Sequence, residues 1–311
     1  MKRTDPVNPT QEDPADSDAA TLADLQRPTG GFAMVAVDQR EALRNMLAEH
    51  QSTPVNDDQV RQFKLTAARV LSPFASAILI DRQFALQDAI AQDVVAPGCG
   101  LIASADHFES AHGELVGEVT IDRKIDAAEL KAQGVVALKL LVLYRPDGEP
   151  DDRIQMTQEF IEICSKAGLV SIIEPLSRKP LDDREWDWNR GIHDAARELG
   201  SLGADLYKAE VPFHGNADET AVRRACRELT SVIAGPWVVL SSGVHEDVFP
   251  TAVKWACAEG ASGFLAGRAV WASSLGKHPL EEDLRTNAVA RLRRLDEVVE
   301  RSMRERSERP A

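Results

Sequence analysis

Two lysines stand inside apolar segments of the sequence, where charged side chains are rare. Lys139 lies within residues 136–143 and Lys208 within residues 204–209, and Glu174 ends an apolar segment between them. Lysine is almost never fully buried unless it is paired. A desolvated lysine near another cation loses its proton more easily, so its amine becomes a nucleophile toward a ketone. The pattern predicts that amine and carboxylate meet in a cleft. It leaves open which lysine reacts, and whether either is structural.

Two glycine-containing turns indicate an anion site. Ser241, Ser242 and Gly243 close one apolar segment, and Gly267 and Arg268 close the next. Small residues let backbone N–H groups approach a phosphate, and arginine adds a bidentate donor. We therefore predict a phosphate site formed by both turns, with a pair of ordinary turns as the alternative.

Three polar residues end the first apolar segment. Asp38 is suited to orient a substrate hydroxyl or to balance the lysines, and Gln39 is suited to bind hydroxyls. Arg40 is predicted to meet a second anion at the far end of the pocket. Asp38 equally suits the cap of a following helix. Asp81 and Asp106 end the next two segments, and their roles cannot be separated from capping by sequence.

Eight near-continuous apolar segments can form strands that are buried on both faces. They are residues 33–38, 76–81, 100–105, 136–143, 169–174, 204–209, 237–241 and 262–267. Helical patterns occupy residues 57–71, 151–167, 188–202, 219–233, 245–259 and 280–304. Eight strands with helical crossovers predict an α/β fold of the TIM (β/α)8 barrel type. An open doubly wound sheet is the alternative, although no GxGxxG follows the first strand. Barrel chemistry sits at the carboxyl ends of the strands, where the residues above are found.

Composition limits the classes of function. The chain has 311 residues, a formal net charge of −14 and 43% hydrophobic residues, which is typical of a soluble globular protein. Such a charge argues against broad nucleic-acid binding, but a local pocket can still hold an anionic substrate. No apolar run is long enough to span a bilayer and no signal peptide is recognised, so we expect no membrane partner and a cytoplasmic location.

The start of the chain differs from the rest. Residues 1–26 are rich in Pro, Asp and Thr, and they are predicted to form a disordered tail. Residues 27–311 are predicted to form a single domain. The spacing of the cysteines and histidines offers no convincing metal site, so we expect neither metal nor cofactor. The residues concerned are Cys99, Cys164, Cys226, Cys257, His107 and His112.

Several of these segments together resemble a known family. Residues 30–42, GGFAMVAVDQREA, are similar to the opening of the sulfofructosephosphate aldolases of sulfoquinovose breakdown. Further similarity lies in residues 137–143, 171–175, 203–208, 241–244 and, over the longest run, 260–273. The resemblance covers roughly residues 29–300. The related tagatose 1,6-bisphosphate aldolases share the barrel, the DQR segment and the lysines. Both are class I aldolases, which use a lysine and no metal.

The resemblance implies roles for individual residues. Lys208 would form the Schiff base, and Lys139 and Glu174 would be the neighbouring acid–base pair. Asp38, from its place at the end of the first apolar segment, completes the predicted catalytic set. The phosphate of the dihydroxyacetone phosphate half would be held by Ser242, Gly243, Gly267 and Arg268. The implied reaction is cleavage of 6-deoxy-6-sulfofructose 1-phosphate to dihydroxyacetone phosphate and 3-sulfolactaldehyde. The alternatives are a tagatose or fructose 1,6-bisphosphate aldolase and a non-catalytic barrel that binds sugar phosphates.

The resemblance says least about which residues bind the far end of the substrate, which carries the sulfonate. A sulfonate carries one negative charge where a phosphate carries nearly two, and it lacks the bridging oxygen. Arg40 and Arg145 are the predicted donors for it. Residues 178–189, with their tryptophans, and the tail depart from the family pattern, and that loop could reshape the pocket mouth. Apolar positions on the last helix suit a subunit contact in a homo-oligomer or packing on the barrel.

Overall fold

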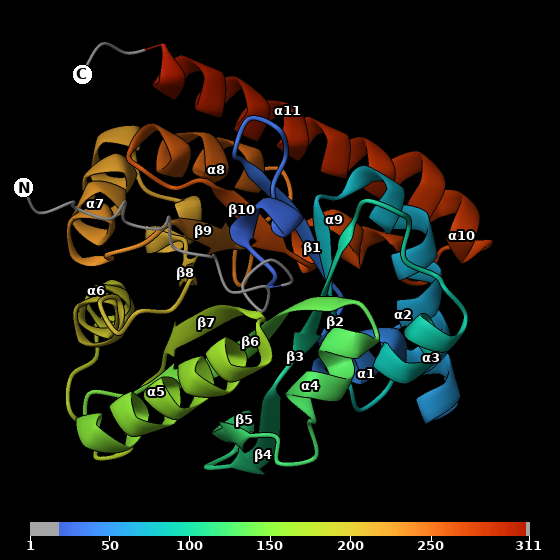
Figure 1. The fold of residues 1–311 in the computed structure, drawn as a ribbon, viewed down its shortest axis with the longest axis horizontal. Helices are drawn as coiled ribbons and strands as arrows, with labels where there is room; N and C mark the ends of the chain where they lie inside the picture. Colours follow the sequence, from blue (N-terminus) through green and yellow to red (C-terminus); the bar gives the residue numbers. More distant parts are fainter. Residues whose placement is uncertain (1–18, 309–311) are drawn as a thin grey trace, which may run out of the picture.

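Eight parallel strands close into a barrel in the computed structural model, which describes residues 19–308 (Figure 1). They are β1 (Phe32–Ala36), β2 (Ala77–Asp81), β3 (Gly100–Ser104), β6 (Val135–Tyr144), β7 (Val170–Ser177), β8 (Leu206–Glu210), β9 (Trp237–Leu240) and β10 (Gly263–Ala266). Their order around the barrel is β1-β10-β9-β8-β7-β6-β3-β2, and β1 pairs with β2 to close it. The predicted TIM barrel is confirmed, and the open sheet is wrong.

Helices surround this barrel. They are α1 (Glu41–Ala48), α2 (Asp57–Leu71), α3 (Leu86–Ala91), α4 (Ala127–Ala132), α5 (Pro150–Ala167), α6 (Trp188–Leu199), α7 (Glu219–Val232), α8 (Phe249–Ala258), α9 (Arg268–Trp271), α10 (Leu280–Asp283) and α11 (Val289–Ser307). Each predicted helix is present with shifts at its ends, except that the one predicted over residues 280–304 is divided into α10 and α11 by a π-helical turn at Leu284–Ala288. The long helix α11 runs along one side of the barrel and packs against α8, α2 and β1 (Figure 1). Within residues 19–308, no helix has the length and apolar character needed to cross a membrane.

Local sequence signals explain where the crossover helices begin and end. The side chain of Asn56 accepts a hydrogen bond from the backbone of Gln59 and begins α2, and Asp218 caps α7 in the same way. Gly168 ends α5 in the left-handed conformation, with φ of 66°, which glycine adopts without steric cost. These three residues set where the crossover helices begin and end.

Alternate residues of each strand point into the barrel, because side chains of a strand have a period of two. Near the amino ends of the strands the interior is filled by a tightly packed apolar cluster. This cluster includes Met34, Leu79, Ala137, Ile172 and Leu206. Two residues further along three of these strands, the sequence carries Lys139, Glu174 and Lys208. A polar layer therefore lies directly above the apolar one, toward the carboxyl ends of the strands.

The predicted tail lies only partly within the described residues. Residues 1–18 are outside the part of the chain that the structure describes. Residues Leu22–Leu25 form a 3₁₀ helix, and Leu25 is fully buried against the inner apolar cluster of the barrel. Arg27 pairs with Asp296 of α11 at 3.0 Å. The prediction that residues 19–26 belong to a disordered tail is therefore wrong, because Leu25 buries apolar surface that offsets the cost of ordering.

A β-hairpin that the sequence analysis did not predict follows β3. Its strands are β4 (Asp106–Ala111) and β5 (Glu114–Ile121), which pair antiparallel. Phe108, Val116 and Val119 of the hairpin pack against a small apolar cluster at the carboxyl ends of the barrel strands. That cluster consists of Leu141, Leu176 and Leu240. The hairpin therefore covers part of the barrel end where chemistry is expected.

Candidate active site

A cavity of about 560 Å³ opens at the carboxyl ends of the strands. It brings together nine of the predicted site residues. They are Asp38, Gln39, Arg40, Glu174, Lys208, Ser241, Ser242, Gly267 and Arg268. Lys139, Arg145 and Gly243 do not belong to its lining. The structure thus separates the predicted residues into those that line the cavity and those that do not.

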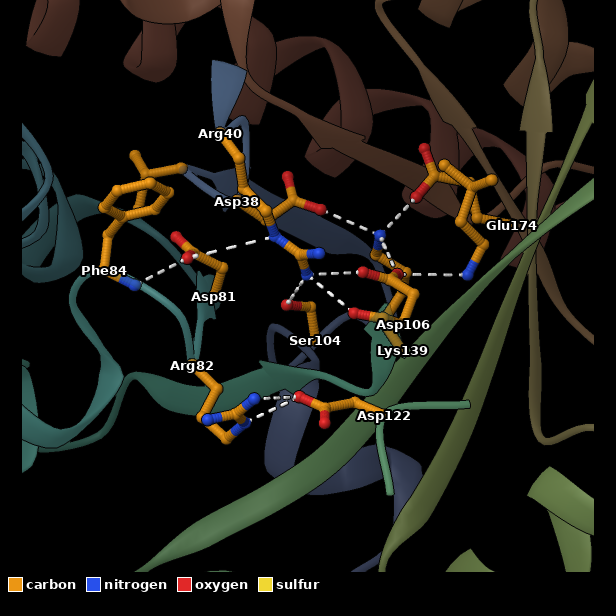
Figure 2. A network of polar contacts seen from close by, with 12 residues as sticks. Asp38, Arg40, Asp81, Arg82, Phe84, Ser104, Asp106, Asp122, Lys139 and Glu174 are labelled. Atoms are coloured by element: carbon orange, nitrogen blue, oxygen red, sulfur yellow. Dashed lines mark hydrogen bonds and ion pairs between the residues drawn. The ribbon is translucent and has the colours of Figure 1, made fainter. Parts of the chain in front are cut away.

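Lys139 is fully buried beneath the cavity and lies among three carboxylates (Figure 2). Its Nζ is 2.8 Å from Asp38 Oδ2, 2.9 Å from Asp106 Oδ2 and 3.0 Å from Glu174 Oε2. Burial by itself would lower the pKa of Lys139, but the three carboxylates together raise that pKa well above its ordinary value. Lys139 is therefore held as a cation.

Lys208 lies on the cavity side of the same carboxylate. Its Nζ is 2.9 Å from Glu174 Oε1, so Glu174 joins the two lysines through its two oxygens. Lys208 lines the cavity, whereas Lys139 does not. Of the two lysines, Lys208 is the one that a ligand in the cavity can reach.

Asp38 lines the cavity beside these lysines. Burial alone would raise the pKa of Asp38, but the charges of Lys139 and Lys208 hold this pKa below its ordinary value. The helix that follows begins after Arg40, and no side chain caps it. Asp38 is thus an ionised partner of the lysines, and the alternative that it caps α1 is wrong.

Asp106 is a central member of the site that sequence reasoning could not separate from a helix cap (Figure 2). Its Oδ2 accepts hydrogen bonds from Lys139 Nζ and from the backbone N–H of Leu141 at 3.1 Å. Its Oδ1 accepts one from Arg40 Nη2 at 2.7 Å, and Arg40 also donates to Ser104 Oγ at 3.1 Å. Asp106 therefore fixes both Lys139 and the Arg40 guanidinium.

A second buried pair supports the site from outside the cavity. Lys64 of α2 is fully buried, forms an ion pair with Asp81 and donates to the Val37 carbonyl at 2.7 Å. Burial outweighs Asp81 and lowers the pKa of Lys64. The second oxygen of Asp81 accepts from the backbone N–H of Phe84 at 2.9 Å. The signal for Lys64 in the sequence was a lysine on the apolar face of α2.

The two predicted anion turns meet at the cavity wall. Arg268 Nη2 donates to Ser242 Oγ at 2.7 Å. A Cβ atom at Gly267 would lie 2.6 Å from the Ala36 carbonyl oxygen, so the close approach of these two strands requires glycine there. Gly243 is exposed in its turn, with φ of 74°, and stands outside the cavity. The serine and arginine side chains are thus brought together as predicted, and Gly243 is not.

The structure corrects the assignment of Arg145. Its Nη2 donates to Glu114 Oε2 at 2.8 Å and its Nη1 to the Lys179 carbonyl, so its guanidinium is used in holding the hairpin and a loop. Arg178, the first residue of the loop over residues 178–189, lines the cavity, although no role was predicted for it individually. Extending the alternation of β7 by two residues beyond Leu176 would have found it.

The cysteines and histidines considered as metal ligands do not line the cavity. Within residues 19–308, no three His, Cys, Asp or Glu side chains converge as metal ligands would. His107 and His112 lie on the hairpin with exposed side chains, each next to a glutamate. Burial raises the pKa of Cys164 and Cys226, so these cysteines are protonated thiols.

Comparison with known protein sequences agrees with this description. The model for the DeoC/LacD family aldolases matches residues 32–273. The tagatose 1,6-diphosphate aldolase 2 of Streptococcus mutans is 27% identical over 309 residues, covering 89% of this chain and 93% of that protein. The tagatose 1,6-diphosphate aldolase of Listeria monocytogenes is 26% identical, covering 90% of each.

Solved structures show the same fold. The fructose-bisphosphate aldolase from Plasmodium falciparum has a TM-score of 0.65 at 16% identity, covering 91% of this chain and 94% of that one. An archaeal fructose-1,6-bisphosphate aldolase, solved with its catalytic lysine bound to a carbinolamine intermediate, has a TM-score of 0.59 at 14% identity. It covers 92% of this chain and 99% of its own. At these identities the likeness concerns the barrel itself.

Proposed function

The chain belongs to the DeoC/LacD family of aldolases, and from this premise we propose that it cleaves a phosphorylated ketose through a Schiff base on Lys208. One observation carries the proposal. Glu174 contacts both lysines, yet only Lys208 of the pair reaches the cavity, and Lys139 is held protonated by three carboxylates. Glu174 thus lies between the amine of Lys208, whose proton it can accept, and Lys139, which stays a cation.

The reaction proceeds by formation and loss of an iminium. Glu174 accepts a proton from Lys208, and the free amine attacks the C2 ketone; loss of water gives the iminium. A carboxylate at the site then removes the proton of the C4 hydroxyl. The C3–C4 bond breaks, its electron pair moves to the iminium as an enamine, and an aldehyde leaves. Protonation of the enamine at C3 and hydrolysis release dihydroxyacetone phosphate and the free lysine.

The remaining lining residues suit the binding of such a substrate. Arg268, Ser241, Ser242 and the backbone at Gly267 offer donors for the C1 phosphate, which all candidate substrates share. Gln39 Oε1 is buried and has no hydrogen-bond partner within residues 19–308, so it is available to accept from a sugar hydroxyl.

We propose 6-deoxy-6-sulfofructose 1-phosphate as the substrate, which would place the protein in sulfoquinovose degradation. The support is the resemblance over residues 30–42 and 260–273 to the sulfofructosephosphate aldolases. The second candidate is tagatose 1,6-bisphosphate, which is favoured by the names of the curated relatives. The single domain over residues 27–311, the cytoplasmic location and the homo-oligomer stay predictions.

Borohydride trapping tests this function. The protein is incubated with each candidate substrate, reduced, digested and mapped by mass spectrometry. A mass increase on Lys208, together with release of the matching aldehyde, is the expected result. Trapping on Lys139 would overturn the assignment of the nucleophile. Binding of the sugar phosphate without trapping would instead identify a non-catalytic barrel.

A further inference from the structure

Arg178 lines the mouth of the cavity, and part of its guanidinium has no hydrogen-bond acceptor within residues 19–308. We propose that Arg178 receives the anionic group at the far end of the substrate, and that Glu114 of the hairpin sets the charge this site prefers. The inference rests on the proposed aldolase function. It assigns the far-end specificity to a residue pair outside the motifs of the sequence.

The first support is the position of Arg178 along β7. Glu174, Leu176 and Arg178 are alternate residues, and all three line the cavity. The backbone N–H of Arg178 donates to the Tyr144 carbonyl at 2.8 Å, so the pairing with β6 continues through this residue. Four residues of strand span about 13 Å. Arg178 therefore lies near the cavity rim, and Glu174 with its lysines lies at the floor.

The second support is the order of the strands. The proposed phosphate donors follow β9 and β10, Lys208 lies on β8, and Arg178 follows β7. These four strands are consecutive neighbours in the barrel. A ketose with its C1 phosphate at β9 and β10 and its C2 at Lys208 therefore extends its remaining carbons toward β7. Arg40, after β1, stands on the other side of β10.

The third support is how loosely Arg178 is paired. Its Nε is 3.7 Å from Glu114 Oε2, and its Nη1 donates to the Ser177 carbonyl at 3.3 Å. Its Nη2 donates to no acceptor in the described part of the chain, so donors remain for a ligand. Arg40 is anchored more firmly, because its Nη2 donates to Asp106 Oδ1 at 2.7 Å and to Ser104 Oγ at 3.1 Å and its guanidinium lies 4.1 Å from the ring centre of Phe108, although its Nε also has no hydrogen-bond partner within residues 19–308.

Glu114 gives this end of the cavity a charge preference. Its Oε2 is shared by Arg178 and by Arg145, and the Glu114 side chain is 32% exposed. Arg145, Arg178 and Glu114 together carry a single net positive charge, and Glu210 and Arg268, which have opposite charges when ionised, also interact with Arg178. One sulfonate neutralises that charge, whereas a phosphate, which carries nearly two negative charges, leaves an excess beside Glu114. The pair therefore favours a sulfonate over a phosphate at the far end.

Steady-state kinetics with two substrates test this. The substrates are 6-deoxy-6-sulfofructose 1-phosphate and tagatose 1,6-bisphosphate. Arg178→Gln is expected to raise KM about ten- to a hundredfold for both, with kcat little changed, because one charge-assisted contact is lost. Glu114→Gln is expected to shift the ratio of kcat/KM toward the bisphosphate by about tenfold. Arg178→Lys, which keeps the charge, is expected to recover part of the loss.

A structural role in holding the hairpin would behave differently. Val119→Ala is the matched control, because Val119 packs the hairpin on the barrel but does not line the cavity. This variant is expected to leave the ratio of the two substrates unchanged. If Val119→Ala reproduces the effects of Arg178→Gln, or if Glu114→Gln leaves the ratio unaltered, the proposal is wrong.

Borohydride trapping of dihydroxyacetone phosphate separates this inference from the proposed function. That compound carries the C1 phosphate and the ketone but no far end. Arg178→Gln is expected to trap it on Lys208 as the wild type does. Absence of trapping in the wild type would refute the aldolase function itself. Normal trapping with unchanged KM values in Arg178→Gln would refute only the role of Arg178.

Discussion

Lys208 and Lys139 are joined by a single carboxylate, with Nζ distances of 2.9 Å and 3.0 Å to the two oxygens of Glu174. The two lysines nevertheless differ in environment. Lys139 has two further carboxylate partners and no exposure, whereas Lys208 has the cavity on its other side. Because of this difference, we expect substitution of Lys208 to remove activity and substitution of Lys139 to lower stability.

Replacement of the cavity lysine should abolish cleavage and leave the fold intact. In Lys208→Ala, the proposed nucleophile is lost, while Glu174 keeps its ion pair with Lys139. Activity with either substrate should fall to background, and the circular dichroism spectrum and Tm should stay near those of the wild type. Residual turnover above background would show that another amine forms the intermediate.

Replacement of the buried lysine should destabilise the protein. Lys139→Met would leave Asp38, Asp106 and Glu174 together without their shared cation. Breaking a buried ion pair by removing one partner costs about 3–5 kcal/mol. Urea unfolding should show a loss of at least this size in the free energy of unfolding, whereas Lys208→Ala should show a much smaller one. Equal stability of the two variants would contradict the assignment of Lys139 as the cation that the three carboxylates share.

Glu210 should make stability fall as pH rises toward neutrality. This glutamate ends β8, and its Oε2 accepts from the Ser177 backbone N–H at 2.7 Å. Burial raises the pKa of Glu210 from 4.5 to about 7, with the nearby Glu174 adding to the effect. Between these values the folded state holds a proton that the unfolded state has released, so folding weakens as pH increases.

The control for this pH effect is the variant Glu210→Gln. Glutamine keeps the shape and an acceptor oxygen, but it does not titrate. The wild type should lose up to about 3 kcal/mol relative to this variant between pH 4.5 and pH 7. Denaturant unfolding at several pH values measures the difference. Parallel pH profiles for the two proteins would show that Glu210 does not carry the proton.

Arg268→Ala should weaken the handling of every phosphorylated ketose to the same degree. Arg268 is proposed to bind the C1 phosphate, which sulfofructose phosphate and the sugar bisphosphates share. A charge-assisted bidentate contact is worth roughly 1.5–3 kcal/mol, so kcat/KM should fall about ten- to a hundredfold. The ratio between the two substrates should stay constant. A changed ratio would mean that the substrate lies in the cavity in the opposite direction.

The barrel and most of the residues at its carboxyl end could be predicted from local patterns in the sequence. Strands buried on both faces appear as continuous apolar runs, so all eight could be recognised, and the helices between them carried a clear 3.6-residue period. Because parallel strands all end at the same face of a closed barrel, polar residues at their ends had to converge. Nine of the predicted site residues accordingly line one cavity.

The contacts of each polar residue at this end depend on how the strands and loops pack together. Whether a strand residue points inward depends on where its strand begins relative to its neighbours, and Lys139 and Lys208 acquire different depths from this register alone. Asp106 and the hairpin strands β4 and β5 gave no continuous apolar run, because one face of the hairpin is exposed to solvent. Arg145 does not line the cavity because it pairs with Glu114, which lies 31 residues earlier in the sequence. Such pairings follow from packing across strands, which no local pattern in the sequence records.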